Sequence, residues 1–107
     1  MKGDHIGEFE ELVLLAVAAL GDEAYGVSIK ERLDRETRRD ISIGAVYAAL
    51  DRLEGKWLVE SRETPGPAAR GGRRRRSFAT TATGRRTLRD MRALRERLWR
   101  ATPVRGR

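Results

Sequence analysis

The strongest constraint on the fold is a pair of amphipathic helical patterns with only a short connector between them. The first pattern covers about residues 25–37, and the second begins after Ser42, a favourable N-cap residue. Apolar residues recur at three- and four-residue steps in both patterns: Tyr25, Ile29 and Leu33, then Ile43, Val46, Leu50 and Leu53. Because residues 38–41 form only a short turn, we expect the two helices to be neighbours, as in a helix-turn-helix.

The segments on either side of this pair complete the fold class. Residues 8–20 form an apolar helical pattern with glutamates in its first turn. Residues 58–62 and 74–80 are typical of two strands, with a loop rich in Pro and Gly between them. The sequence therefore predicts three helices followed by a β-hairpin.

A last helix, capped by Thr81 or Thr83, is expected to continue to about Ala101. The predicted fold is mainly α with a small β-hairpin, a winged helix-turn-helix. We expect a winged-helix domain over residues 1–82, and a C-terminal helix with a frayed tail over residues 83–107.

The composition fits one small domain that relies on a partner. Hydrophobic residues make up 39% and charged residues 36% of 107, so the core is lean. There is no Cys, which excludes disulfides and thiolate metal sites.

The sequence has no segment that resembles a membrane span or a secretory signal. The longest apolar run, Leu12–Leu20, is far shorter than the roughly 20 residues of a membrane span, and the acidic N-terminal region is unlike a secretory signal. We expect a cytoplasmic protein without a membrane partner.

Charge is distributed unevenly along the chain. Residues 1–61 carry a net charge of −5, whereas residues 62–107 carry +12. A basic half beside a mildly acidic half indicates a polyanionic partner, with a solvated basic tail as the alternative.

The sequence offers no set of residues that fits a familiar catalytic or metal site. His5 is the only histidine, so neither a His-dependent triad nor a zinc site can be assembled, and no phosphate-binding Gly-Lys-Ser/Thr motif is present. We expect no enzymatic activity, no cofactor and no metal.

Several motifs together resemble the PadR-like transcriptional regulators. They are, in order, residues 8–15, Tyr25-Gly26, residues 42–47, residues 50–54, residues 70–75 and residues 81–84. The resemblance covers about residues 6–90. It implies a winged-helix homodimer that usually represses transcription, with the C-terminal helix taking part in dimerisation; the short helix here looks like the smaller subfamily.

Trp57 departs from the family pattern, which has Gly at this position to supply the left-handed turn after the helix. Trp in that conformation costs roughly 1 kcal/mol. We therefore consider that the helix ends earlier, at Gly55. The sequence then does not predict the angle between this helix and the wing.

The outer face of the third helix is the first candidate DNA contact. It is small and mostly uncharged, and reads Gly44, Ala45, Tyr47, Ala48, Ala49, Asp51 and Arg52. Small residues let the backbone approach base edges, Tyr47 can contact a phosphate or thymine methyl, and Arg52 can reach phosphate or guanine. Ser42 at the start of the helix belongs to the same candidate surface. The alternative is that Tyr47 packs internally and Arg52 pairs with Asp51 or Glu54.

The basic segment 70–76 is the second candidate, with Arg70, Arg73, Arg74 and Arg75 as phosphate or minor-groove contacts. Strand alternation sends neighbouring arginines in opposite directions, so not all of them can touch DNA at once. Tyr25 either lies beside a helix N-terminus that holds a phosphate or is a plain core residue.

The last helix carries a narrow apolar stripe with heptad-like spacing. We predict a dimer seam formed by Phe9, Leu88, Met91, Leu94 and Leu98. The alternative is packing back onto the first helix. Trp99, beside the stripe, is a candidate contact for a small aromatic effector, as the resemblance implies.

The expected function is that of a homodimeric repressor, which binds double-stranded DNA at a pseudo-palindromic operator. A winged helix that docks a protein and a basic RNA-associated domain are the alternatives. The latter lacks an aromatic platform, because only Trp57 and Phe78 lie near the wing.

Overall fold

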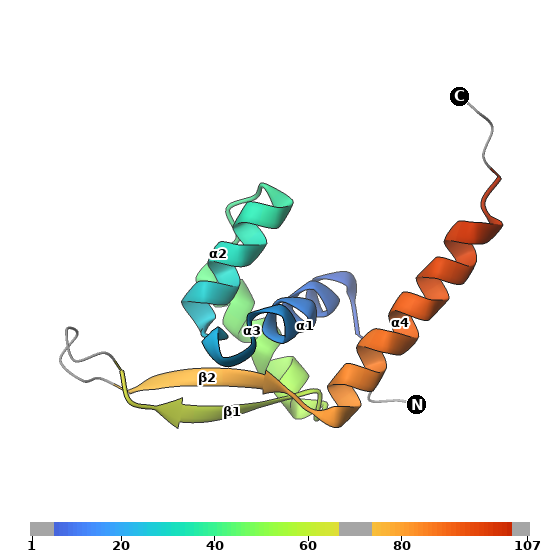
Figure 1. Ribbon diagram of the computed structural model, residues 1–107. Helices are drawn as coiled ribbons and strands as arrows, with labels where there is room; N and C mark the ends of the chain where they lie inside the picture. Colours follow the sequence, from blue (N-terminus) through green and yellow to red (C-terminus); the bar gives the residue numbers. More distant parts are fainter. Residues whose placement is uncertain (1–5, 67–73, 104–107) are drawn as a thin grey trace.

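The computed structural model describes residues 6–66 and 74–103, and it has the predicted order of elements. Three helices come first: α1 (Glu8–Leu20), α2 (Gly26–Thr37) and α3 (Ile43–Gly55), with a 3₁₀ turn, η1 (Gly21–Glu23), after α1. The strands β1 (Val59–Thr64) and β2 (Arg75–Thr80) form an antiparallel hairpin, and α4 (Ala82–Ala101) follows. The hairpin and α4 leave the three-helix body on opposite sides (Figure 1).

The core lies between the three helices and the inner face of the hairpin. Its largest fully buried side chains include Leu14, Ile29, Leu50, Leu53 and Leu58, and Phe78 reaches it from β2. Burial of each such side chain stabilises the fold by about 1.5–3 kcal/mol. The assignment of Ala49 to the outer face of the third helix was wrong, because this residue is fully buried beside Leu50.

The hairpin is longer than predicted at the end of its first strand. Its register runs from Val59 opposite Thr80 to Thr64 opposite Arg75. The other edge of β2 is also occupied, since the Phe78 N–H donates to the Ala24 carbonyl at 2.9 Å. The start of α2 is therefore attached directly to the second wing strand.

Trp57 adopts the left-handed conformation that the family pattern reserves for Gly. Helix α3 ends at Gly55, as expected, yet Trp57 still has a φ of 62°. Its N–H donates to the Glu54 carbonyl, and its own carbonyl accepts from the Thr81 hydroxyl at 2.6 Å. These bonds fix the turn that leads into the wing and join it to the N-cap of α4.

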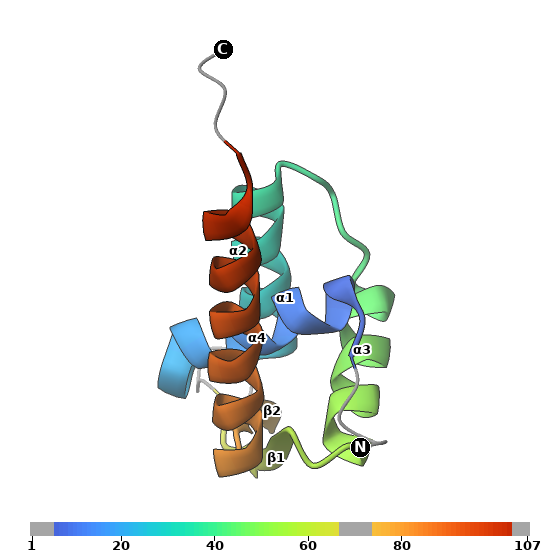
Figure 2. The same cartoon turned by 90° about the vertical axis from the view of Figure 1, so that its right-hand side faces the viewer.

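Helix α4 crosses the outer side of α1 and extends beyond it (Figure 2). Two contacts set its position. Gly84 is buried so closely against the backbone of Leu58 that a Cβ would overlap the Leu58 carbonyl oxygen. Further along, Arg95 forms a two-pronged ion pair with the Glu11 carboxylate. Among the described residues, no helix is both long and apolar enough to cross a membrane.

Candidate nucleic-acid interface

The outer face of α3 is exposed along most of its length. This face carries the exposed residues Ser42, Gly44, Ala45, Ala48 and Arg52, together with the partly exposed Tyr47. On the opposite face, Val46, Leu50 and Leu53 are fully buried. The Ser42 hydroxyl accepts a hydrogen bond from the Ala45 N–H at 3.0 Å. This cap stabilises the helix by about 1 kcal/mol. The exposed stripe is thus carried by a helix whose position the core fixes.

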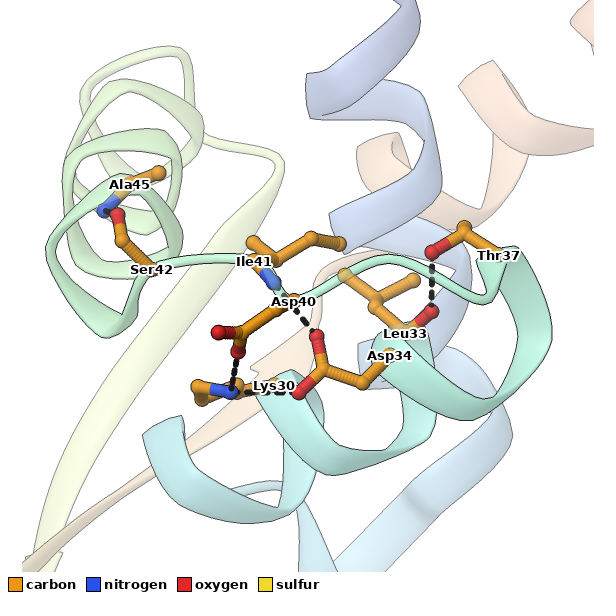
Figure 3. A network of polar contacts seen from close by, with 8 residues as sticks. All are labelled: Lys30, Leu33, Asp34, Thr37, Asp40, Ile41, Ser42 and Ala45. Carbon is orange, nitrogen blue, oxygen red and sulfur yellow. Dashed lines mark hydrogen bonds and ion pairs between the residues drawn. The ribbon is translucent and has the colours of Figure 1, made fainter.

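The turn between α2 and α3 is held by a small polar network (Figure 3). The Asp34 carboxylate accepts from the Ile41 N–H at 2.8 Å and from Lys30 Nζ, which also contacts Asp40 at 3.2 Å. The Lys30 contact, followed by the Ile41 N–H, lowers the pKa of Asp34. Arg38 adopts the left-handed conformation, with φ 60°, at the end of α2. The network therefore fixes the residues immediately before the Ser42 cap.

Tyr47 is only partly on the outer face, because its ring packs against the start of α2. A Cβ at Gly26 would overlap the far end of this ring, and the ring centroid lies 6.5 Å from that of Phe78. The exposed fraction of Tyr47 is 36%. The sequence analysis placed Gly26 in the Tyr25-Gly26 motif at the start of this helix, but it did not predict the contact with Tyr47.

Arg52 pairs with a carboxylate from another helix, not with Asp51 or Glu54. Its Nε lies 2.5 Å from Oε2 of Glu10 in α1, while Lys56 Nζ lies 2.9 Å from Oε1 of the same carboxylate. Burial favours the protonated form of Glu10, but the hydrogen bonds from Lys56 and Arg52 outweigh it and lower the pKa of Glu10.

The three described arginines that begin the second wing strand have different surroundings. The guanidinium of Arg75 stacks over the ring of Tyr25, with its Cζ 3.7 Å from the ring centroid. Arg74 forms an exposed ion pair with Glu63 at 3.2 Å. Arg70 and Arg73 lie outside the described residues.

Arg76 points toward α3 and, together with Ser61 of the first wing strand, donates to a carboxylate of that helix. The Glu54 carboxylate accepts from Arg76 Nη2 at 2.8 Å through one oxygen and from the Ser61 hydroxyl at 2.9 Å through the other. Both wing strands are therefore bonded to α3 through the single side chain of Glu54. Apart from its place in the motif of residues 50–54, nothing in the sequence indicated this role of Glu54.

The predicted dimer residues fall into two groups. Phe9, Leu88 and Met91 are half-buried and pack against the chain's own core. Leu94 and Leu98 are exposed, and so is Trp99. An open groove between α1 and α4 is lined by Leu15, Leu98 and Trp99, among others. In the part of the chain that the structure describes, no cluster of His, Asp and Glu side chains could hold a metal ion.

A helix-turn-helix with an exposed second helix and an adjoining hairpin defines a winged helix-turn-helix protein. Residues 14–90 match the model of the transcriptional regulator PadR-like family. The chain belongs to this family, whose members are non-enzymatic regulators that bind DNA.

Solved structures of related proteins have the same fold. A PadR-like transcriptional regulator from Bacillus cereus is 19% identical with a TM-score of 0.72, over 87% of this chain and 85% of that one. A PadR family regulator from Eggerthella lenta is 27% identical with a TM-score of 0.67, over 88% and 81% of the two chains. Another from hypervirulent Clostridium difficile is 26% identical with a TM-score of 0.63, over 88% of both chains. No curated protein matches the chain.

Proposed function

We propose that this PadR-like regulator is a cytoplasmic homodimeric repressor that recognises a pseudo-palindromic operator. The observation that carries the proposal is the bare outer face of α3. Gly44, Ala45 and Ala48 are exposed there on a helix whose other face is fully packed. A surface of this kind fits a major groove, where short side chains allow close approach of the backbone to base edges.

The residues around this face are suited to distinct roles. Tyr47 and Arg52 are placed to contribute contacts to the operator sequence, and Ser42 marks the end of α3 that enters the groove first. Arg74 and Arg75 on the wing, with Tyr25 beneath Arg75, would contact the phosphate backbone. Arg70 and Arg73 are proposed to act with them.

The C-terminal part, residues 83–107, is proposed to pair with a second copy. The support is the apolar surface that α4 leaves uncovered: Leu94 is 48% and Leu98 64% exposed. A second α4 would cover this stripe and set two α3 helices about one turn of DNA apart. Trp99, which is 77% exposed beside the groove, would face an aromatic effector if one binds.

The test is selection of bound duplexes from a random DNA pool, followed by mobility shifts at two salt concentrations. We expect enrichment of a two-fold symmetric sequence and a steep loss of affinity with salt. Neutralising Arg73 and Arg74 should weaken binding to all duplexes alike and flatten the salt dependence. Absence of any enriched sequence, or preference for single-stranded RNA or for a protein partner over duplex, would contradict the proposal.

A further inference from the structure

Glu10 lies at the junction between the core and the outer face of α3. It is in the first turn of α1, yet its side chain is only 9% exposed. Each of its two carboxylate oxygens is used: Oε2 meets Arg52 Nε and Oε1 meets Lys56 Nζ. Both partners come from the C-terminal end of the recognition helix, so this carboxylate organises the positive charge there.

Arg52 is the last residue of the exposed stripe along α3, about one helical turn after Ala48 and two turns after Gly44. Its side chain is 53% exposed even though Nε is bound to Glu10. The guanidinium is planar, so fixing Nε also restricts the direction in which the two Nη groups point. In an arginine held in this way, the two Nη groups are already oriented to donate to two acceptor atoms that lie in one plane.

We propose that Glu10 is a positioning residue, which holds Arg52 so that its Nη fork recognises a guanine edge in each operator half-site. The inference rests on the proposed function, DNA binding by α3. Guanine offers the N7 and O6 acceptors in the major groove, and bidentate contact with arginine is the commonest specific pairing. An unheld arginine would instead reach for any nearby phosphate, which carries no sequence information.

The neighbouring Glu11 provides an internal comparison. It is as buried as Glu10, but its partner is Arg95 of α4, away from the α3 surface. Both glutamates bridge α1 to another helix, and only Glu10 bridges to the candidate DNA surface. The two substitutions Glu10→Gln and Glu11→Gln therefore change charge and shape equally, and they separate a role in positioning Arg52 from a general role in stability.

The experiment uses the full chain and the duplex that the wild type selects from the random pool. Affinities are measured for this duplex, for duplexes with one base pair changed at a time, and for an unrelated duplex. For Glu10→Gln we expect about tenfold loss of preference at one G·C pair in each half-site, within the range for a bidentate contact, together with higher affinity for the unrelated duplex. Glu11→Gln should keep the wild-type preference at that pair.

Arg52→Lys is the second variant, because it leaves Glu10 in place and keeps the positive charge. Lysine lacks the planar fork, so this variant should lose preference at the same base pair as Glu10→Gln. The inference is overturned if the two variants affect different positions, or if Glu10→Gln weakens binding to every duplex alike. Failure of the wild type to select any duplex would reject the proposed function itself, and this result is seen before any variant is made.

Discussion

Helices α3 and α4 are both amphipathic, but the chain completes the packing of only one of them. In α3, Val46, Ala49, Leu50 and Leu53 are fully buried, and the exposed side is small and weakly charged. In α4 only Gly84 is buried, and the apolar stripe becomes progressively exposed toward its C-terminal end. The orientation of α3 is therefore set within one chain, whereas the far half of α4 keeps apolar surface that the chain itself does not cover.

The largest difference between the two helices is expected for large-to-small substitutions. Leu50→Ala should lower the free energy of unfolding by about 2–5 kcal/mol, because it leaves a cavity in the core. Leu98→Ala should leave the stability of the monomer almost unchanged and weaken self-association instead. Chemical denaturation at low protein concentration and sedimentation measure the two effects. Equal destabilisation of the monomer by both variants would contradict the comparison.

The next largest effect on stability is expected at Gly84, near the start of α4. In Gly84→Ala the new Cβ would overlap the carbonyl oxygen of Leu58, a backbone atom that cannot swing aside. We expect a loss of about 1–3 kcal/mol in the free energy of unfolding, typical of overpacking. Gly55→Ala is the matched control, since its Cβ meets nothing within 4 Å. Thermal unfolding should show a lower midpoint for the first variant only.

Gly26→Ala tests the corresponding close contact between the start of α2 and Tyr47 of α3. Here the Cβ would meet the far end of the Tyr47 ring, which can rotate away, so the stability cost should be smaller than for Gly84→Ala. The displaced Tyr47 should nevertheless change the intrinsic tyrosine fluorescence and lower the preference for the operator over unrelated duplex. An unchanged preference would show that the position of Tyr47 has no part in recognition.

The smallest effect concerns pH. The pKa of Glu10 in the folded chain lies below its ordinary value of 4.5, so the ionised form is stabilised by folding. This contribution is fully present above pH 4.5 and is lost as the pH falls through the lower folded pKa. The loss of stability on acidification should be smaller in Glu10→Gln than in the wild type. A series of thermal midpoints between neutral pH and pH 3 measures the difference.

Local patterns predicted most of the fold, whereas the long-range contacts could not be predicted. The residue type at Ser42 predicted the cap, and helical periodicity predicted α3 with most of its exposed stripe. Two positions were misplaced: Ala49 is buried, and Ile43, expected on the apolar side, is 38% exposed. Glu10 and Arg52 are 42 residues apart, and Glu11 and Arg95 are 84 apart. Such pairings depend on how helices pack together, and no spacing in the sequence encodes them.

Trp57 illustrates a second limit of the sequence. The family pattern indicated that a left-handed residue belongs at this point, and the high cost for Trp suggested that the chain would avoid it. The chain ends α3 at Gly55 and keeps the left-handed turn as well, with the hydrogen bonds from Trp57 to Glu54 and from Thr81 to Trp57 in place. A local hydrogen bond and the tertiary one from Thr81 thus hold a conformation that the intrinsic preference of Trp would reject.

Ala48→Glu is the substitution that shows whether the outer face of α3 lies against DNA. Ala48 is exposed, so the substitution should leave the thermal midpoint unchanged while placing a negative charge against the duplex. We predict a loss of about 100-fold or more in operator affinity, since like charges at an interface cost several kcal/mol. Ala82→Glu, at another exposed alanine in the first turn of α4, should bind as the wild type does. Wild-type affinity of Ala48→Glu would contradict the account.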